Sequence, residues 1–248
     1  MTFNNVSVVL VRTSHGGNIG AVARAMANMG LSDLRLVEPS TFPSDEATAR
    51  AVGAKQILEN AQVYATLDES ISDSGYVVGA TARSRSISWP CSDPASAMTE
   101  VADLCQSGKV SLLFGREASG LTNEELDRCQ RHVRIPVSEN YPSINLAGAV
   151  LILCYELRRA FTLRSMQFKG NVDSRLPLAS AEQVQLFFEH LEIVLNEVGF
   201  LKQPSSRLLR KIKRIFSRAP LQEQEVNILR GILTSVQYNQ RLNERSEN

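Results

Sequence analysis

The chain has 248 residues, of which 43% are hydrophobic and 21% are charged, as is typical of a soluble globular protein. This length fits one large domain, or one medium domain with a small one. An apolar run long enough to span a bilayer and a basic-then-apolar signal pattern are both missing, so we expect a cytoplasmic protein with no membrane partner.

The four cysteines and three histidines are widely separated along the chain. No CxxC pair occurs, so we expect reduced thiols and predict no metal site. The net charge of +1 conceals a basic segment between Ser205 and Arg218 that contains no acidic residue. Local charge of this kind matters more for a polyanionic partner than the overall balance does.

Predicted strands and helices alternate over the N-terminal part of the chain. In order, we expect a strand at 6–11, a helix at 19–29, a strand at 31–39, a helix at 45–58, strands at 61–66 and 74–83 around a helical turn at 67–73, a helix at 93–107, a strand at 109–115, a helix within 116–129 capped by Thr122 with Glu125, a strand at 132–137 and a helix at 145–161. Such alternation predicts an α/β domain with a mostly parallel sheet.

The helix at 145–161 is apolar on nearly all sides over its first turns. It is too apolar for an exposed surface, so we expect it in the core or in an oligomer interface. Beyond it the chain becomes polar and rich in Gly and Pro, and then three helical patterns follow. We therefore predict an α/β domain at 1–164, a linker at 165–179 and a small helical module at 180–248.

Three stretches carry candidate chemistry. The first, "SHGGNIGAVARAMANMG" (14–30), has glycines directly after a strand, but it matches neither GxGxxG nor GxxxxGK[ST], and Arg24 sits a turn further in. An ordinary tight turn before an amphipathic helix explains it equally well. The glycines are expected to form a tight strand-to-helix turn open to a ligand.

The second and third stretches also follow strands. In "LLFGREASGL" (112–121) a glycine ends a buried strand, where ligands of parallel sheets bind, although Glu117 alone reads as a solvated carboxylate. In "IPVSENYPSINLAGA" (135–149), Ser143 and Asn145 precede the apolar helix. Taken alone, simple N-capping by either residue explains that position.

Taken together, the three stretches resemble the three motifs of the TrmH branch of the SPOUT methyltransferases. The matching sequences are N-I-G-A-V-A-R (18–24), F-G-R-E-A-S-G-L (114–121) and I-P (135–136) with S-I-N-L-A (143–147). "GATARSRSISWP" and "EVNILRGIL" narrow the resemblance to the TrmJ type, the tRNA (cytidine/uridine-2′-O)-methyltransferases. The third motif departs slightly, since Ser-Leu-Asn is usual where Ser-Ile-Asn stands here, and Pro142 offers no backbone N–H.

The resemblance implies a SPOUT fold, in which a parallel sheet ends in a deep C-terminal trefoil knot. The knot would bind S-adenosylmethionine, largely through backbone groups, as the only cofactor. The residues implied at this pocket are Ala80, Thr81, Ala82, Gly115, Ile135, Pro142, Ser143, Ile144 and Leu146.

The resemblance also assigns catalytic roles. Arg24 would activate the ribose hydroxyl and engage the adjacent phosphate; because the pKa of arginine is normally above 12, orientation through the phosphate is the safer physical expectation. Asn18 would orient the ribose or Arg24, Glu117 would hold the site's backbone or Arg24, and Ser143 and Asn145 would shape the pocket. In a homodimer, Arg24 of one subunit would face the cofactor of the other, with the apolar helix in the interface.

The basic segment near the C-terminus fits an RNA role, with tRNA as partner. Its side chains have helical spacing opposite a packing face of Leu208, Leu209, Ile212 and Ile215. The predicted RNA-binding residues, besides Arg24, are Arg207, Arg210, Lys211, Lys213 and Arg214. Their contacts would be salt-dependent and largely independent of sequence.

The resemblance indicates position 32 of the tRNA anticodon loop as the methylated nucleotide. Three alternatives stay open: a SPOUT enzyme acting on ribosomal RNA, a non-catalytic RNA-binding protein on the same scaffold, and a nucleotide-binding Rossmann enzyme. The C-terminal placement of the extra module argues against the first, the intact motif residues against the second, and the missing glycine fingerprint against the third.

Overall fold

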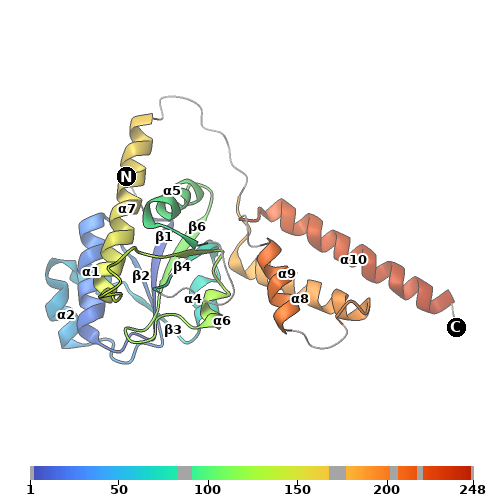
Figure 1. Cartoon of the computed structure of the whole chain (residues 1–248), viewed down its shortest axis with the longest axis horizontal. Helices are drawn as coiled ribbons and strands as arrows, with labels where there is room; N and C mark the ends of the chain where they lie inside the picture. Colours follow the sequence, from blue (N-terminus) through green and yellow to red (C-terminus); the bar gives the residue numbers. More distant parts are fainter. Residues whose placement is uncertain (1–2, 83–90, 168–176, 202–205, 217–219, 247–248) are drawn as a thin grey trace.

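A parallel sheet lies at the centre of the N-terminal part of the molecule (Figure 1). The computed structural model describes residues 3–82, 91–167, 177–201, 206–216 and 220–246, and within them this sheet has seven strands in the order β3-β2-β1-β6-β4-β7-β5. All neighbouring strands run parallel. The strands are β1 (Val6–Val11), β2 (Asp33–Val37), β3 (Gln62–Tyr64), β4 (Ser74–Ala80), β5 (Cys91–Ser92), β6 (Lys109–Phe114) and β7 (Arg131–Val133).

Helices cover both faces of this sheet, so its central strands are apolar on both sides. Along β1, Val8 and Leu10 join one buried cluster, whereas Val9 and Val11 join another. The described helices are α1 (Gly16–Met29), α2 (Asp45–Ala51), η1 (Val52–Ala54), α3 (Lys55–Glu59), α4 (Leu67–Ile71), α5 (Pro94–Leu104), α6 (Asn123–Leu126), α7 (Leu146–Gln167), α8 (Ala181–Glu197), α9 (Ser206–Phe216) and α10 (Glu223–Ser246).

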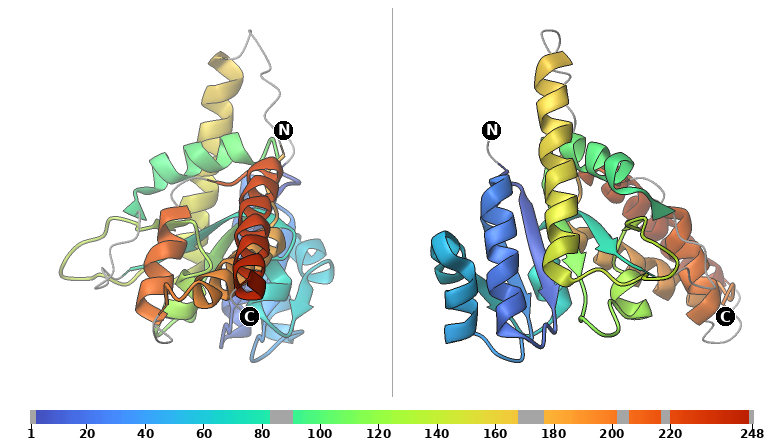
Figure 2. Two further views of the ribbon diagram at one scale, coloured as in Figure 1. Left: turned by 90° about the vertical axis from the view of Figure 1, so that its right-hand side faces the viewer. Right: turned by 60° about the vertical axis from the view of Figure 1, so that its left-hand side comes forward.

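Helices α1, α5 and α7 pack on one face of the sheet. The first cluster contains Met26 of α1, Met98 of α5 and Leu153 of α7, and α1 and α7 lie side by side (Figure 2). The second cluster, on the opposite face, contains Ile71 of α4 and Leu126 of α6. The α/β prediction is confirmed. The sheet lies between two layers of helices.

The glycines of the first stretch have a different role from the one predicted. They lie inside α1, which begins at Gly16 rather than near Ile19, and they face α2. A Cβ at Gly20 would overlap the backbone of Ala47, and one at Gly16 would overlap the side chain of Ser44. These glycines therefore allow α1 and α2 to pack closely, and the expected open turn for a ligand is wrong.

Other segments are shorter than predicted. The helical pattern at 45–58 divides into α2, η1 and α3 at Val52, which has a φ of 50°. Strand β7 ends at Val133 and the chain continues as a loop to Asn145. The helix expected within 116–129 is α6 alone, where the predicted capping box of Thr122 and Glu125 is present.

Helix α7 buries only one side in the single chain. Leu153 and Leu157 are buried, whereas Leu151 and Tyr155 are 37% and 52% exposed. The helix continues to Gln167, into the predicted linker. No helix among the described residues is long and apolar enough to cross a membrane.

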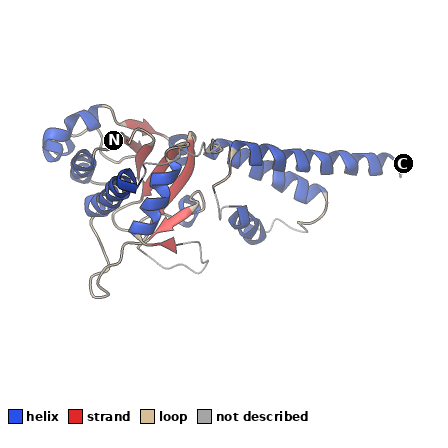
Figure 3. Ribbon diagram, turned by 90° about the horizontal axis from the view of Figure 1, so that it is seen from above, coloured by secondary structure: helices blue, strands red, loops and turns tan. Residues whose placement is uncertain are grey.

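The C-terminal helices form a small core of their own, and α8 and α10 extend away from the sheet (Figure 3). Phe187 and Phe188 of α8 pack on Phe216 of α9 and Val226 of α10. Before α8, Ala179 donates a backbone hydrogen bond to Leu221. The final residues of the predicted linker are thus paired with the start of α10, while residues 168–176 lie outside the described part.

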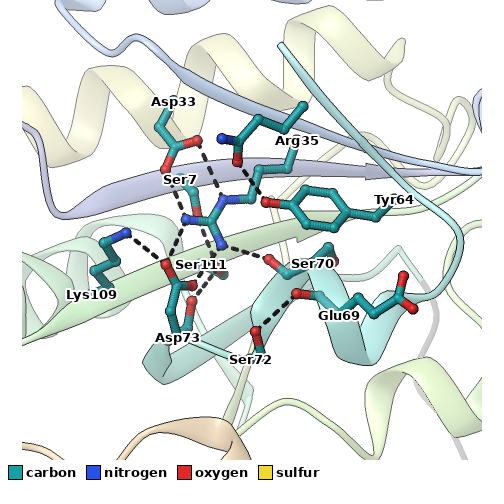
Figure 4. Close-up of polar contacts among 12 residues, drawn as sticks. Ser7, Asp33, Arg35, Tyr64, Glu69, Ser70, Ser72, Asp73, Lys109 and Ser111 are labelled. Atoms are coloured by element: carbon teal, nitrogen blue, oxygen red, sulfur yellow. Dashed lines mark hydrogen bonds and ion pairs between the residues drawn. The ribbon is translucent and has the colours of Figure 1, made fainter. Parts of the chain in front are cut away.

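A buried polar cluster lies at the amino edge of the sheet (Figure 4). The Arg35 guanidinium, 4% exposed, donates to both carboxylate oxygens of Asp73, to Asp33 and to the Ser70 carbonyl oxygen. Lys109 adds an ion pair of 2.6 Å to Asp73. Burial acts to raise the pKa of Asp73, but hydrogen bonds from Arg35 and Lys109 outweigh it and lower the pKa to about 2.

We predict that Arg35→Ala lowers the free energy of unfolding by about 3 kcal/mol, because it leaves two carboxylates without their buried partner. Urea unfolding followed by circular dichroism at pH 7 measures this. As a control, Arg128→Ala removes a more exposed pair with Asp68 and should cost about 1 kcal/mol or less. Equal losses in the two variants would contradict the structural role of Arg35.

The pH dependence of this cluster has a definite sign. The folded-state pKa of Asp73 lies below its ordinary value of 3.8, so its stabilising contribution is present above that value and lost as pH falls through about 2. The stability difference between wild type and Asp73→Asn should therefore persist from pH 7 to about pH 4 and shrink below it.

Candidate active site

A cavity of about 330 Å³ opens at the carboxyl edge of the sheet, where ligands of parallel α/β sheets bind. Ala80 at the end of β4, Phe114 at the end of β6 and Val133 at the end of β7 form part of its wall. The remaining wall comes from the residues after β4, the loop after β6, the loop between β7 and α7, and the first turn of α7.

Every residue predicted to bind the cofactor lines this cavity. They are Ala80, Thr81, Ala82, Gly115, Ile135, Pro142, Ser143, Ile144 and Leu146. They come from three segments that are far apart in the sequence, and the fold brings these segments together around one cavity. Most are apolar or small, which leaves backbone groups as the main polar partners for a ligand.

The loop after β6 is held in a tight turn. A Cβ at Gly115 would overlap the backbone of Gly120 and Leu121, and Gly120 has a φ of 68°. Arg116 makes two hydrogen bonds, of 3.1 and 2.9 Å, to the carboxylate of Glu125 in α6. Glu125 also accepts the backbone N–H of Thr122, so α6 and the turn are fixed together.

Glu117 extends from this turn to the start of α1. Its carboxylate accepts hydrogen bonds from the Ser14 hydroxyl at 3.0 Å, from the Asn18 amide at 2.9 Å and from the backbone N–H groups of Ser14 and His15. His15 is the N-cap residue of α1 but provides no side-chain cap, and the first turn contains no acidic residue. Glu117 therefore supplies, from a distant segment, the negative charge that a helix N-terminus favours.

The protonation state of Glu117 follows from these contacts. Partial desolvation acts to raise its pKa, but the hydrogen bonds from Asn18 and Ser14 outweigh desolvation and lower the pKa below its ordinary value. Glu117 is therefore a fixed carboxylate at neutral pH and is unsuited to accept a proton from a substrate.

Asn145 joins the third motif to the first. Its Nδ2 donates to Oδ1 of Asn18 at 3.3 Å, and its Oδ1 accepts the backbone N–H of Ala147 at 2.9 Å. Asn145 therefore both caps α7 and belongs to the site. Its amide oxygen accepts from the backbone of Ala147, while its amide nitrogen donates to Asn18.

Arg24 and Ser143 occupy different positions relative to this cluster. Ser143 lines the cavity and is exposed. Arg24 lies further along α1, is exposed, and is not among the residues that line the cavity. Within the described residues of one chain, Glu117 contacts the backbone and Asn18 rather than Arg24.

The basic residues of α9 divide into two groups. Arg210 makes an ion pair of 2.9 Å with Asp127, next to α6, and Lys213 lies 5.5 Å from the centroid of the Phe188 ring. Lys211 is exposed and Arg214 half-buried, whereas the side chain of Arg207 lies outside the described part. Ile215, predicted to pack, is 61% exposed, so that part of the predicted packing face is wrong.

Sequence reasoning missed several contributors to this site. Arg116 lines the cavity and braces its turn, while Ser14 supplies two of the contacts to Glu117. Val137 and Ala149 also line the wall. No local signal marks the pair of Arg116 and Glu125, although the capping box already placed Glu125 at the start of a helix.

The fold and the three converging motifs define an α/β methyltransferase with a parallel sheet. Residues 5–155 match the SpoU rRNA methylase family, and the chain belongs to that family. Residues 182–247 match the C-terminal domain of the tRNA methyltransferase TrmJ.

Relatives match over nearly the full length. The tRNA (cytidine/uridine/adenosine-2′-O-)-methyltransferase TrmJ of Pseudomonas aeruginosa is 45% identical, covering 94% of each chain. The tRNA (cytidine/uridine-2′-O-)-methyltransferase TrmJ of Sodalis glossinidius is 44% identical, covering 96% of this chain and 93% of the relative.

Solved structures of methyltransferases have a similar fold. The crystal structure of TrmJ from Z. mobilis has a TM-score of 0.79 at 31% identity, covering 93% of this chain and 98% of that one. A structure described as concerning 2-OH methylation of C/U34 on tRNA has a TM-score of 0.52 at 25% identity; it covers 64% of this chain and 97% of its own.

We predict that Glu117→Ala speeds hydrogen exchange at the Ser14 and His15 amides by about tenfold or more, because both lose a charged acceptor. Hydrogen exchange followed by NMR measures this. Glu124→Ala, which removes an exposed carboxylate from the neighbouring helix α6, is the matched control and should leave those amides unchanged. If both variants exchange like wild type, Glu117 does not hold the start of α1.

Proposed function

We propose that this chain is an S-adenosylmethionine-dependent tRNA 2′-O-ribose methyltransferase that acts on cytidine or uridine at position 32 of the anticodon loop. The observation that carries the proposal is the convergence of three separate motifs on one cavity and one hydrogen-bonded cluster of Asn18, Glu117 and Asn145. Relatives that match over nearly the whole chain are named for this activity on tRNA.

The cavity fits the cofactor in size and chemistry. A volume of about 330 Å³ lies within the range of small-molecule sites. The absence of a side chain at Gly115 lets the backbone of Gly120 and Leu121 approach it closely, and all three residues line the cavity. S-adenosylmethionine would supply an electrophilic methyl group, so the protein's own task is to position the ribose and manage its proton.

Arg24 is proposed to bind the phosphate next to the target ribose and so to orient the 2′-hydroxyl. A guanidinium is pre-organised for bidentate phosphate contacts and stays charged at neutral pH. Asn18, held by Glu117 on one side and Asn145 on the other, would fix the ribose beside the cavity. Ser143, on the cavity wall, would contact the nucleotide where it enters.

The active site is proposed to form across a homodimer interface. In one chain, Arg24 is exposed away from the cavity lining, and Leu151 and Tyr155 leave an apolar strip exposed on the neighbouring helix α7. A second subunit packed on α7 would cover this strip and bring Arg24 to the partner's cavity. The trefoil knot, the domain bounds at 164 and 180 and a cytoplasmic location stay predictions.

The helical module supports tRNA over the alternatives. Residues 182–247 match a domain of a tRNA methyltransferase. An rRNA enzyme would share the cavity and the cluster, so only the helical module favours tRNA over rRNA as the substrate. A non-catalytic scaffold is disfavoured by the intact cluster.

Mapping ribose methylation tests the function directly. tRNA from cells lacking the protein should lose a 2′-O-methyl group at one anticodon-loop nucleotide, and purified protein with S-adenosylmethionine should restore it. Methylation restored in rRNA alone would establish the alternative substrate. An unchanged tRNA pattern, with no transfer in vitro, would refute the proposal.

For Arg24→Ala we expect a folded dimer that binds S-adenosylmethionine normally but loses methyl transfer by about 10²-fold or more, because the ribose is no longer oriented. Arg24→Lys should keep part of the activity, since an ammonium still attracts phosphate. Arg50→Ala, which removes an exposed arginine from α2, serves as the control. Near-normal turnover by Arg24→Ala would refute the proposed role of Arg24 in orienting the ribose.

Charge reversal on α9 should weaken tRNA binding. Because Arg210 and Lys213 have partners inside the protein, the sharpest test uses the exposed Lys211. Lys211→Glu should reduce the salt dependence of tRNA binding by a slope of about 0.7–0.9, as expected for one lost phosphate contact, and leave cofactor affinity unchanged. Lys55→Glu on α3 provides the same charge change elsewhere, and an equal effect there would contradict a specific role for α9.

A further inference from the structure

The loop from Arg134 to Asn145 is anchored at both ends. After β7, the backbone N–H of Arg134 donates to the Ser92 carbonyl oxygen of the neighbouring strand β5. At the other end, Asn145 bonds to Asn18 and caps α7. Figure 2 shows the loop, in yellow-green, extending away from the sheet between these two anchors.

The tip of this loop stands at the rim of the cavity. Val137 on the outgoing side and Pro142 on the returning side both line the wall. Between them the Tyr141 backbone N–H donates to the Ser138 carbonyl oxygen at 3.1 Å, which closes a turn. The Tyr141 side chain is 76% exposed at this turn.

The cavity, of about 330 Å³, lies at the low end of the range for a single small-molecule site. A ribose that reaches the cavity must leave the regular stacking of its strand, and its base then needs a new surface. Proteins commonly provide an aromatic ring for this purpose. Tyr141 is a large exposed ring one residue from the cavity wall, on a loop whose far end, Asn145, donates a hydrogen bond to Asn18.

We propose that Tyr141 stacks on the base of the nucleotide whose ribose is methylated, which rests on the proposed function. Pro142, next to it, fixes φ and limits the conformations of the returning side of the loop, so less order has to be gained on binding. Tyr141 is a substrate-binding residue and takes no part in proton transfer.

Stacking also accounts for base tolerance. A ring face accepts any base, because stacking reads no hydrogen-bonding pattern. The names of the relatives include enzymes for cytidine and uridine, and one that adds adenosine. A ring that holds pyrimidines and purines alike is compatible with both sets.

The test compares Tyr141→Ala and Tyr141→Phe in the full-length protein, with tRNA transcript and radiolabelled S-adenosylmethionine. Tyr141→Ala should lower kcat/KM for tRNA by about 10- to 100-fold, the range of one lost base stack. Tyr141→Phe should stay within about threefold of wild type, because the ring is retained. Both should keep the wild-type cofactor affinity and oligomeric mass. Tyr238→Ala removes another tyrosine, 64% exposed on α10, as the matched control.

A photocrosslink provides a readout that a purely structural residue would not affect. An anticodon stem-loop with 5-iodouridine at the mapped target nucleotide should crosslink to residue 141 on irradiation and not in Tyr141→Ala. Wild-type kinetics in Tyr141→Ala, equal losses in the Ala and Phe variants, a change in oligomeric mass, or a crosslink elsewhere would each overturn the proposal. Wild type that methylates no tRNA would instead refute the proposed function itself.

Discussion

The arrangement of the site depends on one carboxylate that caps a helix from a distant part of the chain. Helix α1 begins without an acidic residue or a capping side chain of its own, and Glu117 supplies the missing acceptor. The same carboxylate binds Asn18, which binds Asn145 at the start of α7. Two helix N-termini and the turn after β6 are thereby fixed relative to one another, and the cavity lies among the same segments.

The polar groups of the domain are divided between the two edges of the sheet. At the amino edge, Arg35 is almost fully buried and its partners neutralise it, so this cluster is suited to stability alone. At the carboxyl edge, the polar groups are partly exposed and surround an apolar cavity, which leaves room for a ligand. The basic residues of α9 show the same division within a single helix, since Arg210 binds Asp127 while Lys211 faces solvent.

The sequence predicted the alternation of elements and the capping box of α6, and the nine residues it assigned to the cofactor pocket all line the cavity, because periodicity and motif residues are local signals. It failed where contacts between distant segments decide. Gly16 and Gly20 read as an open turn, yet the approach of α2 determines their role. The Arg210–Asp127 pair was equally hidden, since its members are 83 residues apart. The break at Val52 lies beside Gly53, but a single glycine inside a helical pattern is often tolerated and does not by itself predict a break.

The hydrogen bonds from Ala147 through Asn145 and Asn18 to Glu117 all point in one direction. Each asparagine amide accepts at its oxygen and donates from its nitrogen, and the series ends on a charge that cannot donate. An aspartate at either amide position would remove the donor at that point, and at position 18 it would also place a second negative charge against Glu117. The amides at positions 18 and 145 therefore depend on each other's orientation, although 127 residues separate them.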